Sequence, residues 1–136
     1  LLFLFFLCQD FLLFGLFFGG LAVVIGAFAA HALKEVLNQV QQQSFETGVR
    51  YQMYHAFFML FISTQPHLRT KLIFNLLFAG TVVFSFSIYL LNLREVLDAD
   101  WLRFLGPITP IGGLLLISAW AIALFLTIKF CSEFIV

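Results

Sequence analysis

The apolar segment FLLFGLFFGGLAVVIGAFAAHAL, residues 11–33, gives the strongest indication of the fold of this chain. It is longer than the roughly 20 apolar residues that a helix needs to cross a hydrocarbon core of about 30 Å. It contains no Asp, Glu, Lys or Arg. Because lipid accepts a spanning backbone only as a helix or a closed barrel, this segment predicts a membrane-spanning helix.

The composition of the whole chain supports the same interpretation. Of the 136 residues, 62% are hydrophobic and only 10% are charged. A soluble domain is about 45–50% apolar and about 25% charged. A soluble fold of this size would leave large apolar patches in water, whereas a bilayer solvates them. We therefore expect an integral membrane protein with a single domain covering residues 1–136.

Three further segments complete the expected topology. Residues 72–93 and 111–130 are long and apolar, and residues 47–64 are apolar behind a polar front. All are too long and continuous for barrel strands, so the prediction is an all-α four-helix bundle with both termini on the same side. Lys and Arg divide almost evenly between the two sides, so the positive-inside rule selects no orientation.

Polar connections separate the predicted spans. Residues 34–46 form a glutamine-rich linker that has room for a short interfacial helix, and residues 65–71 form a tight loop with Pro66 as helix breaker. Residues 94–110 form an acidic turn and an amphipathic stretch that ends in the prolines at the start of the last span. Residues 1–7 are as apolar as a signal-peptide core but lack its flanking features, so we do not expect a signal peptide.

Small side chains recur at helical spacing in the first and last spans. Without a hydrophobic drive between helices in lipid, such stripes let backbones approach closely. We expect them to pack within the bundle; a contact with a second copy or a partner helix is the alternative. The predicted packing positions are Gly15, Gly19, Ala22, Gly26 and Ala30 in the first span and Gly112 and Gly113 in the last.

Polar side chains gather at the ends of the spans that face away from the termini. Ionisable groups at membrane depth should face the bundle interior or water and find partners. Glu46 and Arg50, four residues apart on a helix, are expected to form an ion pair. The predicted polar cluster consists of His31, Arg50, Tyr51, Gln52, His55, Tyr89 and Thr109.

Several functional classes lack their sequence signatures. His31 and His55, without a nearby cysteine or carboxylate pair, do not form a usual set of metal ligands. Neither a catalytic motif nor a glycine-rich phosphate loop is present, so we expect no enzyme activity and no cofactor. The charge pattern indicates no nucleic-acid partner. Cys8 and Cys131, near the two ends, are expected to be free thiols.

Three segments together resemble the YgdD/YwdK-like family of small four-span membrane proteins. They are GAFAAHAL (26–33), FETGVRYQMYHA (45–56) and LGPITPIGG (105–113). The resemblance implies the same fold and location but no activity, because the family's function is unknown. Its motif positions here are Gly26, His31, Gly48, Arg50, Tyr51, Gln52, His55, Gly106, Pro107, Thr109, Pro110 and Gly113.

The chain departs from the family pattern at Ala29, at Phe86 and over residues 1–10. Phe86 stands where the family has a small residue, so no close helix approach is expected there. The 20 phenylalanines are consistent with dense aromatic packing, but we prefer the interpretation that lipid tolerates any apolar residue.

Two functions are compatible with these observations. The preferred one is a non-enzymatic structural or accessory component within a larger membrane complex, docking on other subunits through small-residue helix faces. The alternative is a module that binds or transports a lipid headgroup or small anion at the polar cluster around Arg50 and His55. The expected location is a bacterial inner membrane or an organelle membrane such as the mitochondrial inner membrane, with membrane lipid as a partner in either case.

Overall fold

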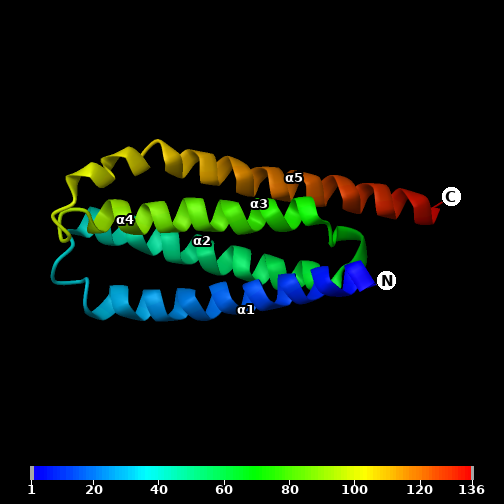
Figure 1. Cartoon of the computed structure of the whole chain (residues 1–136), viewed down its shortest axis with the longest axis horizontal. Helices are drawn as coiled ribbons and strands as arrows, with labels where there is room; N and C mark the ends of the chain where they lie inside the picture. Colours follow the sequence, from blue (N-terminus) through cyan, green and yellow to red (C-terminus); the bar gives the residue numbers. More distant parts are fainter. Residues whose placement is uncertain (1, 136) are drawn as a thin grey trace.

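Nearly the whole chain folds into four helical rods that lie side by side (Figure 1). The computed structural model describes the backbone of residues 2–135 and the side chains of residues 5–133. The first two rods are α1 (Leu2–His31) and α2 (Gln39–Thr64). The third joins α3 (Lys71–Thr81), the π-helical segment η2 (Val82–Phe86) and α4 (Ser87–Leu93), and the fourth is α5 (Ile108–Ile135).

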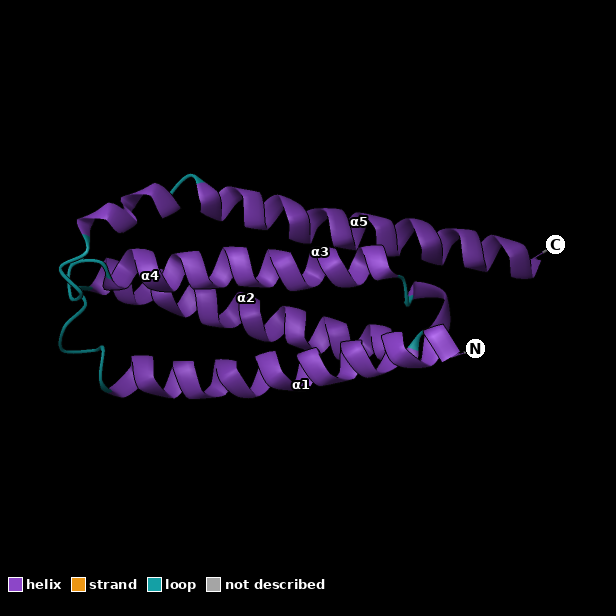
Figure 2. Cartoon of the chain, viewed as in Figure 1, coloured by secondary structure: helices purple, strands orange, loops and turns teal. Residues whose placement is uncertain are grey.

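Both ends of the chain lie at the same end of the bundle (Figure 1). The short helix η1 (Pro66–Leu68) turns the chain there. The turns between α1 and α2, and the helix η3 (Asp100–Leu105) before α5, lie at the opposite end, called here the loop end (Figure 2). No strand occurs between residues 2 and 135. The all-α fold class, with both termini at one end, is therefore confirmed.

Three of the rods have the length and composition of membrane spans. Among the described residues these are Phe5–His31, Lys71–Leu93 and Asp100–Glu133. By the same measure of length and composition, α2 does not qualify as a membrane span. Its N-terminal half is rich in glutamine and other polar side chains. The polar residues at the start of this segment, already visible in the sequence, are thus the reason why α2 is less apolar than the other three rods.

The start of α2 differs from the expectation of a polar linker up to residue 46. The helix begins at Gln39 because Asn38 and Gln41 form a reciprocal capping box: the Asn38 side chain accepts from the Gln41 amide at 2.9 Å, and Gln41 accepts from the Asn38 amide at 3.0 Å. This arrangement satisfies two backbone donors that would otherwise lack partners, which stabilises the two extra turns.

The helices do not all pack on one another to the same extent. α1 packs mainly on α2, α2 packs on α4 and η2, and α5 packs mainly on α3 and η2. In Figure 1, α1 and α5 accordingly form the two outer rods. The apolar side chains on their outward faces stay exposed, as expected where lipid is the solvent.

Phenylalanine rings fill the core between α1 and α3. Phe14 lies 4.9 Å from Phe78 and 5.6 Å from Phe74, and Phe11 meets Phe74 edge-on at 5.3 Å between ring centroids. Such offset and T-shaped pairs add to the attraction from burial alone. Part of the phenylalanine content is therefore dense aromatic packing, the interpretation not preferred from sequence, while others such as Phe125 face outward.

Candidate functional site

A fully buried glutamine joins three helices at the centre of the predicted polar cluster. The Nε2 group of Gln52 on α2 donates to the Phe18 carbonyl of α1 at 2.8 Å. Its Oε1 accepts from the phenol of Tyr89 on α4 at 2.8 Å. Phe18 lies roughly 20 Å along α1 from His31, at about 1.5 Å per residue. These two hydrogen bonds of Gln52, called here the Gln52 tie, therefore lie deep in the bundle. Because a buried polar group without a partner is costly, the three helices hold one another in register here.

Gly48 makes room for the tyrosine of this tie. A Cβ atom at Gly48 would lie 2.7 Å from Cε1 of Tyr89, closer than real contacts allow. The Gly48 carbonyl also accepts a 2.9 Å hydrogen bond from Ser85 of η2, and the Tyr89 ring lies 4.7 Å from the Phe45 ring. The glycine of the motif is thus required for close contact between α2 and α4.

His55 forms a second link, between α2 and α5. Its Nδ1 lies 2.7 Å from the Tyr51 carbonyl, and its Nε2 lies 3.2 Å from Nε1 of Trp120. An indole N–H can only donate, so Nε2 must be the acceptor and Nδ1 must carry the proton. The contacts therefore assign a neutral imidazole with the proton on Nδ1.

Two further hydrogen bonds fix α4 near the loop end. Ser87 and Thr109 share a hydrogen bond of 2.7 Å that joins α4 to α5. Asn92 donates to the Ser44 hydroxyl at 3.0 Å, which joins α4 to α2. Thr109 thus belongs to a separate contact, away from Gln52 and His55.

The structure leaves His31 and Arg50 outside this network. Both side chains are exposed, and within the described residues neither forms a hydrogen bond or ion pair. The prediction of a Glu46–Arg50 ion pair is wrong, because the two side chains form no ion pair in the structure. An exposed pair at this spacing contributes only about 0.2–0.5 kcal/mol, too little to hold two long side chains in one geometry.

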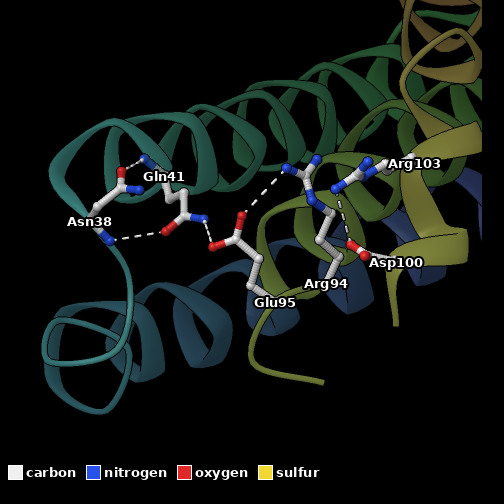
Figure 3. Close-up of polar contacts among 6 residues, drawn as sticks. All are labelled: Asn38, Gln41, Arg94, Glu95, Asp100 and Arg103. Carbon is white, nitrogen blue, oxygen red and sulfur yellow. Dashed lines mark hydrogen bonds and ion pairs between the residues drawn. The ribbon is translucent and has the colours of Figure 1, made fainter. Parts of the chain in front are cut away.

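Polar contacts also close the loop end (Figure 3). Gln41 of the capping box donates to Glu95 at 3.2 Å, and Glu95 accepts from Arg94 at 3.4 Å. Arg103 forms an ion pair with Asp100 at 3.3 Å. The capping box was not predicted from the sequence, although Asn followed three residues later by Gln is a recognisable start signal for a helix.

The small-residue positions of α1 lie mainly against α2. A Cβ atom at Gly15 would lie 2.8 Å from the Leu60 side chain, and one at Gly26 would lie 3.2 Å from Val49. Gly19 faces Ala56 at an ordinary 3.7 Å, Ala22 is buried, and Ala30 is exposed.

Among the glycines, Gly112 lies closest to the backbone of another helix. A Cβ atom there would lie 2.5 Å from the backbone nitrogen of Phe84 in η2, and Gly113 faces the Phe84 ring at 3.7 Å. The widened π-helical turn therefore coincides with one of the places where α5 touches the third rod; Gly80 of α3 against Leu116 of α5 is another. Phe86 is partly buried and meets Tyr89 edge-on at 5.6 Å, so the close approach occurs at Phe84 instead.

An apolar groove of about 690 Å³ opens beside His55, between α2 and α5. Its lining includes the rings of Tyr51, Tyr54, Phe84 and Trp120, with Gly113 and Ile117 of α5. Sequence reasoning missed Trp120, since nothing in its apolar run marks it as the partner of a histidine on another helix. As for metals, the described residues hold no group of three or more His, Cys, Asp or Glu side chains arranged to bind an ion.

The fold and this cluster define the class: an integral membrane protein whose buried polar side chains join its helices. The chain belongs to the family described as "Protein of unknown function (DUF423)", whose model matches residues 25–113. That range includes all three segments that carried the resemblance.

Several relatives are membrane proteins by name. The UPF0382 membrane protein SH2409 of Staphylococcus haemolyticus is 39% identical over 113 residues, covering 81% of this chain and 88% of that protein. The UPF0382 membrane protein YwdK of Bacillus subtilis is 35% identical over 115 residues, covering 81% and 89%. The UPF0382 inner membrane protein YgdD of Escherichia coli is 32% identical over 117 residues, covering 83% and 85%.

These relatives confirm the resemblance to the YgdD/YwdK-like proteins and the membrane location of the chain. No solved structure matches it significantly.

Proposed function

We propose that this chain is a non-enzymatic structural or accessory component of a larger membrane assembly. The observation that carries the proposal is the Gln52 tie: its amide bonds to Phe18 and Tyr89. In the same way, both ring nitrogens of His55 have partners. A catalytic site needs polar groups aimed at a substrate, whereas the buried side chains of Gln52 and His55 bond to neighbouring helices.

In this proposal α2 is the fourth span, so that the spans run over residues 11–33, 47–64, 72–93 and 111–130. It lies between the outer rods, and its buried polar groups have partners inside the bundle. Such pairing offsets the cost of polar groups at membrane depth, which a hydropathy criterion does not count.

The outer faces of α1 and α5 are the surfaces left for other subunits. A Cβ atom added at Gly20 on α1 would meet no other atom within 4 Å, so the helix backbone is accessible there. Ala121 on α5 is also exposed. In a membrane, small exposed positions allow a partner helix to approach closely.

Native purification in a mild detergent tests this proposal. The expected result is a stoichiometric membrane partner that is lost in Gly20→Leu and retained in Ala121→Leu, or the reverse, because each variant blocks one outer face. A monodisperse monomer without a co-purifying protein, from membranes crosslinked before extraction as well as without crosslinking, would refute the accessory role.

A second candidate function is binding of a lipid headgroup or small anion, and Arg50 favours it. The guanidinium is exposed and has no hydrogen bond or ion pair within the described chain. It lies beside a depression whose other lining residues are Gly26, Ala29, Ala30, Glu46 and Val49. An unpaired cation at the membrane surface attracts anionic headgroups. Lipid retained after purification, measured by mass spectrometry, should fall in Arg50→Ala but not in Arg103→Ala, an exposed arginine at the loop end.

A further inference from the structure

The groove between α2 and α5 is large and lined mostly by apolar and aromatic side chains. At about 690 Å³ it lies within the range of small-molecule sites, and its lining is apolar except for its two tyrosines and His55. It exists because α5 packs on α3 and η2 rather than directly on α2. Being open between two helices of a membrane bundle, it faces lipid.

Aromatic contacts hold the walls of this groove in place. The Trp120 ring stacks on Phe58 with centroids 3.8 Å apart and an angle of 5° between planes, while its N–H donates to His55. On the other side Tyr51 lies 5.1 Å from the Phe84 ring. A preformed groove loses little conformational entropy when a ligand enters, which favours binding.

Polar groups follow one another from the groove toward the loop end. Side chains on a helix tilt toward its N-terminus, so Tyr51 and Tyr54 of α2 reach toward the loop end. Their hydroxyls form no hydrogen bond with any other described residue, which leaves both as donors. Arg50 precedes Tyr54 by one turn on the same helix face, and its guanidinium is also without a partner among the described residues.

We propose that this groove binds one anionic phospholipid. In this complex an acyl chain of the lipid lies against Trp120. The ester carbonyls of the lipid accept hydrogen bonds from the hydroxyls of Tyr51 and Tyr54, and its phosphate pairs with Arg50. From the loop end toward the groove, the protein presents first a cation, then hydroxyl donors and then an apolar wall. A phospholipid presents its phosphate, its esters and its acyl chains in the same order. The inference rests on the second candidate function, to which it adds the class of ligand and the place of its tail.

Quenching of Trp120 fluorescence by lipids with brominated acyl chains tests the proposal. Trp101→Phe leaves Trp120 as the single indole of the chain. In vesicles of unlabelled phosphatidylcholine, a small fraction of brominated phosphatidylglycerol should quench Trp120 more than the same fraction of brominated phosphatidylcholine. We expect about a fivefold higher relative association constant for the anionic lipid, as about 1 kcal/mol for one arginine predicts.

Two kinds of variant separate headgroup from tail. Arg50→Ala should remove the preference for the anionic lipid, with Arg103→Ala as the matched control. Gly113→Leu, or Ile117→Phe on the exposed wall if the first variant lowers the melting temperature, should fill the groove and reduce quenching by both lipids.

The outcomes distinguish the two claims. If Arg50→Ala removes the preference and the filling variants leave quenching unchanged, the headgroup site holds and the groove proposal is overturned. If the preference is absent from the parent protein, the anionic ligand and the second candidate function both fail. Equal loss of the preference in Arg103→Ala would also overturn the proposal, because it would show only a general surface charge effect.

Discussion

The phenol of Tyr89 lies 2.8 Å from the amide oxygen of Gln52, and the nitrogen of the same amide lies 2.8 Å from the Phe18 carbonyl. One buried side chain thereby connects helices that begin far apart in the sequence. In a bilayer the connection matters because packing and hydrogen bonds, rather than exclusion from water, hold helices together.

Removing the Tyr89 hydroxyl should weaken the bundle. Tyr89→Phe leaves the Gln52 oxygen buried without a donor, so we expect the free energy of unfolding to fall by about 1–2 kcal/mol. Unfolding in mixed micelles with increasing denaturing detergent measures this change. Ser118→Ala is the control, since the Ser118 hydroxyl bonds only within its own helix and is exposed.

A double-mutant cycle then isolates the pair. With Gln52→Leu as the second change, the two effects should be non-additive, because each variant removes the same hydrogen bond. Additive losses would mean that the two side chains act independently, contrary to the geometry.

A methyl group at Gly112 should force two helices apart. Because a Cβ atom there would lie 2.5 Å from the Phe84 nitrogen, the third rod or α5 has to shift. Gly112→Ala should therefore lower the unfolding free energy by about 1–3 kcal/mol, as overpacking does. The matched change, Gly20→Ala, adds the same methyl in open space and should be neutral or stabilising by up to about 1 kcal/mol. Equal effects at the two glycines would contradict the close approach.

The imidazole of His55 should show one tautomer. Since Trp120 can only donate, nitrogen chemical shifts at neutral pH should report a protonated Nδ1 and an unprotonated Nε2. His31, which is exposed, provides the comparison within the same spectrum. In Trp120→Phe the Nε2 signal should move and that of His31 should not; an unchanged Nε2 signal would refute the contact.

Cysteine labelling should decide whether α2 crosses the membrane. Gln43 is exposed at the loop end of α2, and Pro66 is exposed in the turn that follows the helix. In a background with Cys8→Ser and Cys131→Ser, Gln43→Cys and Pro66→Cys should react with an impermeant maleimide from opposite sides of sealed vesicles. Labelling from the same side would show that α2 does not span.

The sequence predicted the fold class well, and the site less completely. The apolar runs predicted the helical rods, and the segment 45–56 contained the two buried side chains, Gln52 and His55, that join the helices. His31 and Arg50 were grouped with them on helical periodicity and depth alone. Those properties place a residue near an end of the bundle but do not say whether another helix covers it.

The amino-acid composition and the lengths of the apolar runs were enough to predict the solvent of this chain and its secondary structure. Composition requires lipid around this chain, and lipid requires that the backbone satisfy its own hydrogen bonds as helix. Which polar groups contact one another became clear from the packing of the helices alone. The contact of His55 with Trp120, and that of Gly112 with Phe84, depends on how rods from distant parts of the chain pack, since a helix has several faces and a pattern along one helix does not specify its neighbours.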